Sequence, residues 1–465
     1  MHAENAESLL GIMSWEPYQP ALCDLKATNE QEDTHSMNVF IFGSSFTAGS
    51  STKIQCCSEY FGDQSKCIDF HPGGDNWYCA WPGFFLRWLA QEFPHVNING
   101  DNFGRSGYSS MIVANTLTHD LSNLNITQRD IIFLDLSITD TNAIQQGQLY
   151  ETTEAMESII RMLCQMSKDG LPTIILLDQW PHIHHREPGP KPINLLSRSS
   201  ASSIYYNISR HYNLPLWSSK QVLWSEFAAT HQSHIAKWLL QYSTHPDFAY
   251  HLFFADLLAL GFTKSLSTCG KLQYRSYNDL PAPYISVHSM DAVCDPLKRP
   301  RLDAFPNSTF VPEDLADFES KLTGWTEFVD HHNVPGFIIN NFALDRELSF
   351  PVDYSELMEL EGEIIKVMYL KTYHNAGMFQ LSLCGETIKG TIDTYHHHHM
   401  SIPAVYTVLL DMRSNMRACK KAPISKRSLG IIYTPHHTGV NYGNPRVHEK
   451  VKILSVQICS RIHAQ

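Results

Sequence analysis

Short apolar runs alternate with longer segments of helical periodicity between residue 37 and about residue 262. The apolar runs predict β-strands, over residues 38–42, 96–98, 131–134, 173–177 and 214–217. The segments between and after them predict helices, over residues 84–93, 152–166, 200–212, 222–240 and 247–260. The run 131–134 is continuously apolar, as a strand covered on both faces must be. This alternation predicts a parallel sheet between layers of helices.

The pattern changes in the second half of the chain. Residues 265–310 are rich in Pro, Ser and Asp without a sustained period, which predicts a linker. Beyond them, short β-type runs are separated by turn residues, at 336–339, 364–370, 379–383, 405–410 and 451–458. These runs predict an all-β, sandwich-like domain. We therefore expect four parts, namely an N-terminal extension (1–36), an α/β domain (37–264), a linker (265–310) and a β-sandwich-like domain (311–465).

Composition and charge exclude some classes of protein. A chain of 465 residues with 43% hydrophobic content is too long for one ordinary core, which agrees with two domains. The formal net charge of -12, without a basic face, argues against a nucleic-acid partner. The first thirty residues hold no basic-then-apolar leader, and the longest apolar stretch is interrupted by His251 and Asp256. We expect a soluble protein with no readable signal peptide and no membrane span.

Cysteine and histidine positions indicate no metal site and no cofactor. The eleven cysteines include no CxxC and no Cys/His spacing that suits zinc, and their odd number leaves the compartment open. Three N-glycosylation sequons begin at Asn125, Asn207 and Asn307. Histidines cluster at 182–185, 396–399 and 436–437. Consecutive residues of a β-type segment point to alternating faces, so we interpret these clusters as surface histidines.

A serine at residue 45 stands on a glycine-flanked turn, Gly-Ser-Ser-Phe-Thr-Ala-Gly, directly after the first predicted strand. Alone, such a segment is more often a structural turn. Three further polar segments, 102–107, 137–140 and 244–246, also fall at the carboxyl ends of predicted strands or in adjoining loops. In open α/β folds these ends meet at the ligand-binding edge of the sheet, so we expect the four segments to converge. They offer a nucleophile, a base and oxyanion donors, as an esterase requires.

These segments resemble the conserved blocks of the SGNH/GDSL hydrolase superfamily over about half of the chain. The resemblance implies a flavodoxin-like, three-layer α/β/α fold. It also implies that Ser45 is the nucleophile and that His245 is its base. The amides of Ser45 and Gly104 and the side chain of Thr139 would form the oxyanion hole. The strand-rich C-terminal part, with residues 334–337 and 369–373, resembles a β-rich extension of some eukaryotic, notably algal, SGNH-like proteins.

The chain departs from the blocks at three positions. Ser44 replaces an Asp, Thr139 replaces the oxyanion-hole Asn, and Tyr242 replaces the acid that orients the histidine. Without that acid the imidazole loses the partner that fixes its tautomer and stabilises its charged form. A carboxylate elsewhere near His245 would restore this support, with Asp178 and Asp140 the first to test.

Two functions remain open. The first is hydrolysis of a carboxylic ester, including O-acetyl esters, by a Ser-His acyl-enzyme route, on a small ester or an acylated glycan. The alternative is a catalytically weak or inactive SGNH-like protein that binds a glycan or another partner.

Overall fold

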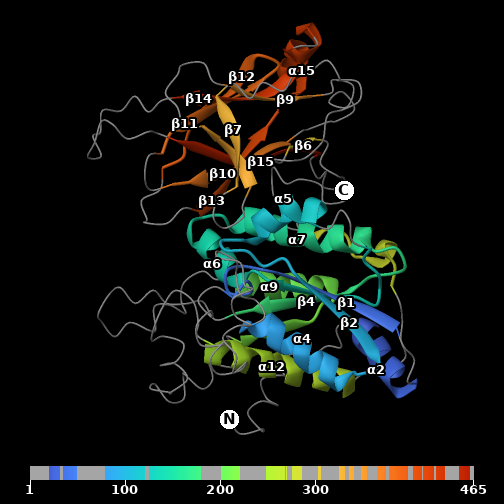
Figure 1. Cartoon of the computed structure of the whole chain (residues 1–465). Coiled ribbons are helices and arrows are strands. Elements are labelled where there is room, and N and C mark those ends of the chain that lie inside the picture. The colour runs from blue at the N-terminus through green and yellow to red at the C-terminus, as the bar shows by residue number, and fades with distance from the viewer. Residues whose placement is uncertain are drawn as a thin grey trace. The chain divides into compact units, whose positions relative to one another are not determined.

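The computed structural model divides into two compact units, Met1–Tyr284 and Ile285–Gln465 (Figure 1). We describe each unit by itself. The described residues are 20–31, 35–49, 79–120, 125–179, 201–219, 248–267, 269, 275–284, 302–304, 324–329, 335–339, 347–352, 364–372, 376–395, 402–410, 412–423, 426–434 and 450–460.

The first unit is built on a five-stranded sheet in which every neighbouring pair of strands is parallel. Its strands are β1 (His35–Gly43), β2 (Val96–Asn102), β3 (Ile131–Asp135), β4 (Thr173–Asp178) and β5 (Leu216–Ser218). The strand order β2-β1-β3-β4-β5 is that of flavodoxin-like folds. The predicted fold class of this half is confirmed. Each strand therefore delivers the residues after its carboxyl end to one edge of the sheet.

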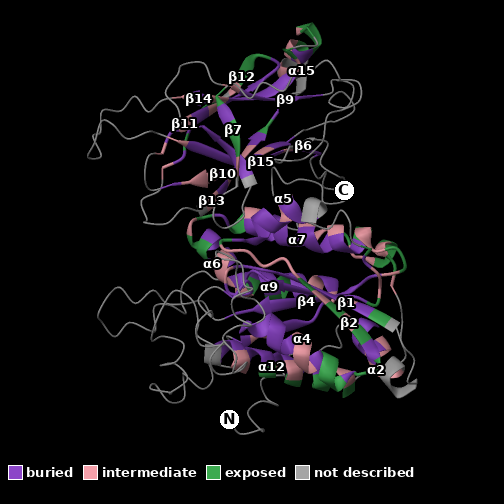
Figure 2. Cartoon of the chain, viewed as in Figure 1, coloured by how far each residue is buried: buried purple, intermediate pink, exposed green. Residues whose placement is uncertain are grey.

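Helices cover both faces of this sheet (Figure 1). One face carries α2 (Pro20–Gln31), α4 (Trp81–Glu92) and α12 (Phe248–Ser267), and the other carries α5 (Ser110–Asp120) and α7 (Leu149–Met166). The short helix α6 (Ser137–Gln145) packs against α7, and α9 (Ser202–Tyr212) packs against β4 and β5. The central strands β3 and β4 are buried along their whole length (Figure 2). In β1, Val39 and Ile41 join a core with Phe85 and Phe254, because alternate residues of a strand face the same side.

Several elements differ from the predicted ranges. The helix expected at 84–93 starts earlier, at Trp81, with Pro82 in its first turn. Residues 20–31 form α2, whose Ala21 and Leu22 belong to the core of the first unit. Polar and β-branched residues interrupt the apolar period of α5 and α6, so the sequence pattern does not predict these two helices. The helix expected at 222–240 lies outside the described residues. Across the described ranges, no helix is long and apolar enough to cross a membrane.

The second unit contains two antiparallel sheets, as the predicted β-sandwich requires. The six-stranded sheet has the order β13-β10-β15-β8-β7, with β6 paired to β15. Its strands are β6 (Leu302–Ala304), β7 (Trp325–Val329), β8 (Pro335–Ile339), β10 (Ile364–Lys371), β13 (Ile402–Leu409) and β15 (Val451–Cys459). The four-stranded sheet has the order β12-β11-β14-β9, with β9 (Glu347–Pro351), β11 (Met378–Leu383), β12 (Glu386–Asp393) and β14 (Ser428–Thr434).

One hydrophobic core joins the two sheets of the second unit. Ile365 and Val367 from β10 share it with Leu381 from β11 and Ile431 from β14. The helix α15 (Met412–Lys421) contacts β11 and β12. The confirmed sandwich follows from this shared core, because each sheet buries one face against the other.

Disulfides tie elements together within each unit. Cys23 in α2 is bonded to Cys269, two residues after α12, and Cys384 after β11 is bonded to Cys419 in α15. Cys79 and Cys459 are disulfide-bonded as well. Cys164 is a free thiol, buried in α7, and burial raises its pKa to about 12. The bond between Cys23 and Cys269 therefore links α2 covalently to the end of α12.

Candidate active site

The predicted nucleophile stands on a tight turn at the carboxyl end of β1. Ser45 is partly buried, and its turn is closed by two backbone hydrogen bonds. The amide of Ala48 donates to the Ser44 carbonyl at 3.0 Å, and the amide of Gly49 donates to the Phe46 carbonyl at 3.2 Å. Gly49 has a φ of 77°, a left-handed conformation that favours glycine. The sequence therefore places Ser45 on a defined turn at the edge where ligands bind in open α/β folds.

A buried carboxylate anchors this turn to the neighbouring strand. The Thr47 hydroxyl donates to Asp135 Oδ2 at 2.6 Å, and the indole nitrogen of Trp81 donates to the same oxygen at 3.1 Å. Asp135 ends β3 and pairs with Gly43 across the sheet. Burial raises the pKa of Asp135 to about 6, although the hydrogen bonds from Thr47 and Trp81 pull it down. Asp135 thus holds the nucleophile turn against β3 and α4.

A second buried contact joins the turn to α12. The ring of Phe46 stacks on the ring of His251, with centroids 4.5 Å apart and planes at 22°. His251 Nδ1 accepts a hydrogen bond from the backbone amide of Trp81 at 3.2 Å. Because α12 starts at Phe248, shortly after residue 245, this contact fixes the helix that follows the predicted base. His245 and Tyr242 lie outside the described residues, so the pairing of Ser45 with His245 stays a prediction.

The loop after β2 lies directly on the nucleophile turn. The Asn102 side chain donates through Nδ2 to the Thr47 carbonyl at 3.0 Å, and the amide of Arg105 donates to the Gly43 carbonyl at 3.1 Å. The amide of Gly104 donates to Asn102 Oδ1 at 2.8 Å. The structure therefore brings Gly104 to the turn, with its amide on the Asn102 side chain. Its service as an oxyanion donor stays a prediction.

Replacing Gly104 by alanine is expected to destabilise the first unit. A Cβ at this position would lie 2.9 Å from Thr47 Cβ, 2.9 Å from Asn102 Oδ1 and 3.0 Å from the Ala48 amide nitrogen. The turn would have to shift, at a loss of about 1 to 3 kcal/mol. Denaturant unfolding measures this, with Gly390→Ala as the control because a Cβ there meets nothing within 4 Å. Equal free energies of unfolding for Gly104→Ala and Gly390→Ala would contradict tight packing around Gly104.

Thr139 lies in the first turn of α6 and bonds to backbone carbonyls. Its Oγ1 is 2.5 Å from the Tyr108 carbonyl oxygen and 2.9 Å from that of Leu136. A hydroxyl has one proton, so it donates to one of them at a time. Thr139 links the residues after β3 to the loop after β2, and its predicted place in an oxyanion hole is not tested by this geometry.

The two carboxylates considered as supports for His245 have partners from other elements. Asp140 is fully buried and accepts hydrogen bonds from the amide and hydroxyl of Ser110, at 2.8 and 3.0 Å, and from the Tyr205 hydroxyl at 3.0 Å. Asp178 accepts from the hydroxyls of Ser202 and Ser218, at 3.0 and 2.7 Å. Both therefore hold α5, α9 and β5 in place.

Asp140 makes the stability of the first unit depend on pH. Burial raises its pKa to about 7, well above the ordinary 3.8 of an exposed Asp. Between about pH 4 and pH 7 the folded state keeps this proton while the unfolded state has lost it. The contribution of protonated Asp140 to folding stability is fully present below about pH 4 and is lost as the pH rises through about 7. The free energy of unfolding falls by at most about 1.4 kcal/mol per pH unit over this range.

Asp140→Asn is expected to remove this contribution. Its amide oxygen can accept from Ser110, and its Nδ2 can donate to the Tyr205 hydroxyl. Denaturant unfolding at several pH values between 4 and 8 should show the wild type losing stability relative to the variant as pH rises. Parallel curves for the two proteins would show that Asp140 does not titrate in this range.

Among the described residues, no group of three or more His, Cys, Asp and Glu side chains is placed to hold a metal ion. The histidine clusters 182–185, 396–399 and 436–437 lie outside those residues. The described part of the site is therefore built from a serine turn, backbone amides and buried carboxylates.

The parallel sheet, with the serine turn after β1 and the glycine loop after β2, forms a flavodoxin-like α/β fold, and the chain joins it to a β-sandwich. The same two-domain arrangement is found in "a two-domain esterase (CEX) active on acetylated mannans", with a TM-score of 0.61 and 14% identity over 96% of this chain and 97% of that one. Its structure co-crystallised with mannopentaose gives a TM-score of 0.58 and 15% identity over the same shares of the two chains.

A variant of the acetyl xylan esterase Axe2 from Geobacillus stearothermophilus covers 50% of this chain with 96% of its own, at 15% identity and a TM-score of 0.34. No family model matches the sequence, and no curated protein matches it. At such low identity, the likeness to the two-domain esterase shows the fold alone. The chemistry has to be argued from the site.

Proposed function

We propose that this protein is a serine esterase that removes acyl groups, O-acetyl groups among them, from a glycan. The observation that carries the proposal is the turn of Ser45. Its neighbour Thr47 is fixed to Asp135 at the carboxyl edge of the sheet, and the Gly104 loop lies against it. The fold matches an esterase active on acetylated mannans along nearly the whole of both chains, which supports this substrate class.

In this mechanism Ser45 Oγ attacks the ester carbonyl carbon while His245 takes the hydroxyl proton. The amides of Ser45 and Gly104 stabilise the oxyanion, so the Gly104 amide has to exchange its Asn102 partner for the substrate oxygen. His245 then gives the proton to the leaving alcohol, and the acyl group stays on Ser45. His245 then takes a proton from water, which attacks the acyl carbon; the bond from that carbon to Ser45 Oγ breaks, His245 returns the proton to Oγ, and the acid is released.

The rival function is that of an SGNH-like protein which binds a glycan without turning it over. The structure offers one observation in its favour. The Gly104 amide and the Thr139 hydroxyl are both already engaged with groups of the protein itself. A preorganised oxyanion hole has its donors directed at the oxyanion, and losing one donor typically lowers turnover about 10²- to 10³-fold.

Covalent labelling distinguishes the two functions. A fluorophosphonate reacts with a serine only when the hydroxyl is activated and the oxyanion site accepts the phosphoryl oxygen. We expect the label on the peptide that contains Ser45, and its loss in Ser45→Ala. Ser44→Ala is the matched control, since it changes the neighbouring, buried hydroxyl and should keep the label. A folded wild type that takes no label would favour the binding protein.

A further inference from the structure

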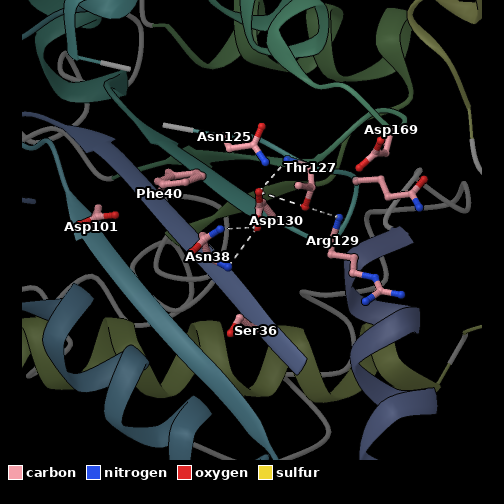
Figure 3. A pocket seen from close by; sticks show the side chains of 10 residues that line it. Ser36, Asn38, Phe40, Asp101, Asn125, Thr127, Arg129, Asp130 and Asp169 are labelled. Carbon is pink, nitrogen blue, oxygen red and sulfur yellow. Dashed lines mark hydrogen bonds between the residues drawn. The ribbon is translucent and has the colours of Figure 1, made fainter. Parts of the chain in front are cut away.

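A polar cavity of about 560 Å³ lies beside the first half of β1, at the other end of the strand from Ser45 (Figure 3). Its volume is within the range of about 300 to 1,000 Å³ that small-ligand sites occupy. The lining residues come from β1, β2, the loop before β3 and the loop after α7, and are Ser36, Asn38, Phe40, Asp101, Asn125, Thr127, Gln128, Arg129, Asp130 and Asp169. The esterase proposal gives this cavity no role.

The floor of the cavity is fixed by one carboxylate. Asp130 Oδ1 accepts from the amide and the side chain of Asn38, both at 3.0 Å, and Oδ2 accepts from the amide of Thr127 at 2.7 Å and its hydroxyl at 3.2 Å (Figure 3). Two of these hydrogen bonds hold Asp130 onto β1, and the other two close the loop before β3 on itself. These hydrogen bonds give the loop that forms this wall of the cavity a defined conformation.

The lining chemistry suits a neutral ligand with many hydroxyl groups. Asp101 and Asp169 offer acceptors and Gln128 offers an amide, while Phe40 lines the cavity with only 1% of its surface exposed. Arg129 forms an ion pair with Asp24 at 3.1 Å. A metal ion is a poorer fit, because within the described ranges no group of His, Cys, Asp and Glu is placed to hold one. Sugar rings, with hydroxyl donors on their edges, match this lining.

Asn125 lines this cavity and begins the sequon Asn-Ile-Thr. Its side chain is exposed, whereas Ile126 is 1% exposed and holds the loop in the core. A sequon asparagine on a surface loop is the acceptor of N-linked glycans in the secretory pathway. A sugar attached to Asn125 Nδ2 would start at the cavity.

The disulfides indicate the compartment in which such a sugar is added. Two bonds, Cys23–Cys269 and Cys384–Cys419, are formed in different units, and Cys79 and Cys459 are bonded too. Structural disulfides form and persist in oxidising compartments and are rare in the cytosol. A chain that forms them in the secretory pathway passes the machinery of N-glycosylation.

We propose that Asn125 carries an N-linked glycan whose first N-acetylglucosamine residue packs in this cavity. The donor is an oligosaccharide linked to a lipid diphosphate. Asn125 Nδ2 forms a bond to the anomeric carbon of the sugar, the bond from that carbon to the diphosphate oxygen breaks, and the lipid diphosphate leaves with the electron pair. The amide nitrogen releases one proton to a base of the transferase. This inference does not depend on the esterase activity.

The test uses the full chain secreted from a eukaryotic host. Enzymatic deglycosylation in ¹⁸O-labelled water, followed by peptide mapping, should convert Asn125 to labelled Asp. An endoglycosidase that leaves only the first N-acetylglucosamine should leave Tm unchanged. Asn125→Gln, which has no attached sugar, should unfold about 2 to 4 °C lower than wild type.

Asn207→Gln is the matched control. Asn207 also begins a sequon and is exposed on α9, but it is not among the residues that line the cavity. It should unfold within about 1 °C of wild type. Wild type and Asn125→Gln made without glycans in a bacterial periplasm should have equal Tm values. An unmodified Asn125 in the secreted protein would overturn the modification. A modified Asn125 with no Tm difference between wild type and Asn125→Gln would overturn the packing of the sugar.

Discussion

Ser45→Ala is expected to lower ester hydrolysis at least about 10³-fold, to the level left by binding and oxyanion stabilisation alone. The reason is that the acyl-enzyme route has no nucleophile without this hydroxyl, since the first covalent bond forms at Ser45 Oγ. The measurement is acetate release from acetylated mannan, together with hydrolysis of a short-chain nitrophenyl ester. Tm should stay close to that of wild type, because Ser45 is only partly buried and its turn is closed by backbone bonds.

Ser44→Ala is the control for this loss. Both variants remove one hydroxyl from the same turn, but only Ser45 is the proposed nucleophile. We expect Ser44→Ala to keep hydrolysis within about tenfold of wild type, since side chains that position a nucleophile indirectly have smaller effects than the nucleophile itself. Equal rates for wild type and Ser45→Ala on both substrates would refute the esterase proposal and leave the binding function.

Asp135→Ala is expected to destabilise the first unit strongly. It leaves the Thr47 hydroxyl and the Trp81 indole nitrogen buried without the acceptor that both now use. Each unsatisfied buried donor costs about 1 to 3 kcal/mol, so we expect a loss of about 2 to 6 kcal/mol. The nucleophile turn would also lose its link to β3, and turnover should fall more than substrate affinity does.

Asp135→Asn is the matched control, because its side-chain oxygen can take the place of Oδ2 and accept from both donors. This variant should lose less stability than Asp135→Ala, since it keeps the hydrogen bonds from Thr47 and Trp81 and loses only the one from Gln179. It should also remove a group whose pKa burial raises to about 6. Denaturant unfolding and the ratio of kcat to KM on a soluble ester distinguish the variants. Similar losses in Asp135→Ala and Asp135→Asn would mean that the charge, and not the hydrogen bonds, holds the turn.

The sequence predicted the parallel sheet because its central strands β3 and β4 are strongly apolar. The run Ile131 to Leu134 could only be a strand covered on both faces, and the structure buries all of it. Helices whose apolar residues do not recur at helical spacing were harder to predict. In α6 the sequence Ser-Ile-Thr-Asp-Thr-Asn-Ala-Ile-Gln has no apolar stripe, and its helix is held by tertiary contacts such as that of Asp140 with Ser110.

Residues of the candidate site that stand in short sequence motifs were predictable. Residues whose role depends on contacts between strands were not. Ser45 and Gly104 stand in glycine-flanked turns that the sequence shows directly. Asp135 was missed, since its role depends on the register that pairs it with Gly43 and on its contact with Trp81. One signal was available, namely a carboxylate that ends a fully apolar strand. Such a group is buried at the ligand-binding edge, and burial of a charge requires partners.

The bond between Cys23 and Cys269 turns the first unit into a covalent ring, because the two cysteines are 246 residues apart and enclose its whole sheet. A protease that cuts one peptide bond anywhere inside the ring opens the chain without releasing a piece of it. The cut protein keeps its mass under non-reducing conditions and separates into fragments only after reduction. The strands on either side of such a cut also remain tethered to one another, so a nicked molecule can still refold as a single unit.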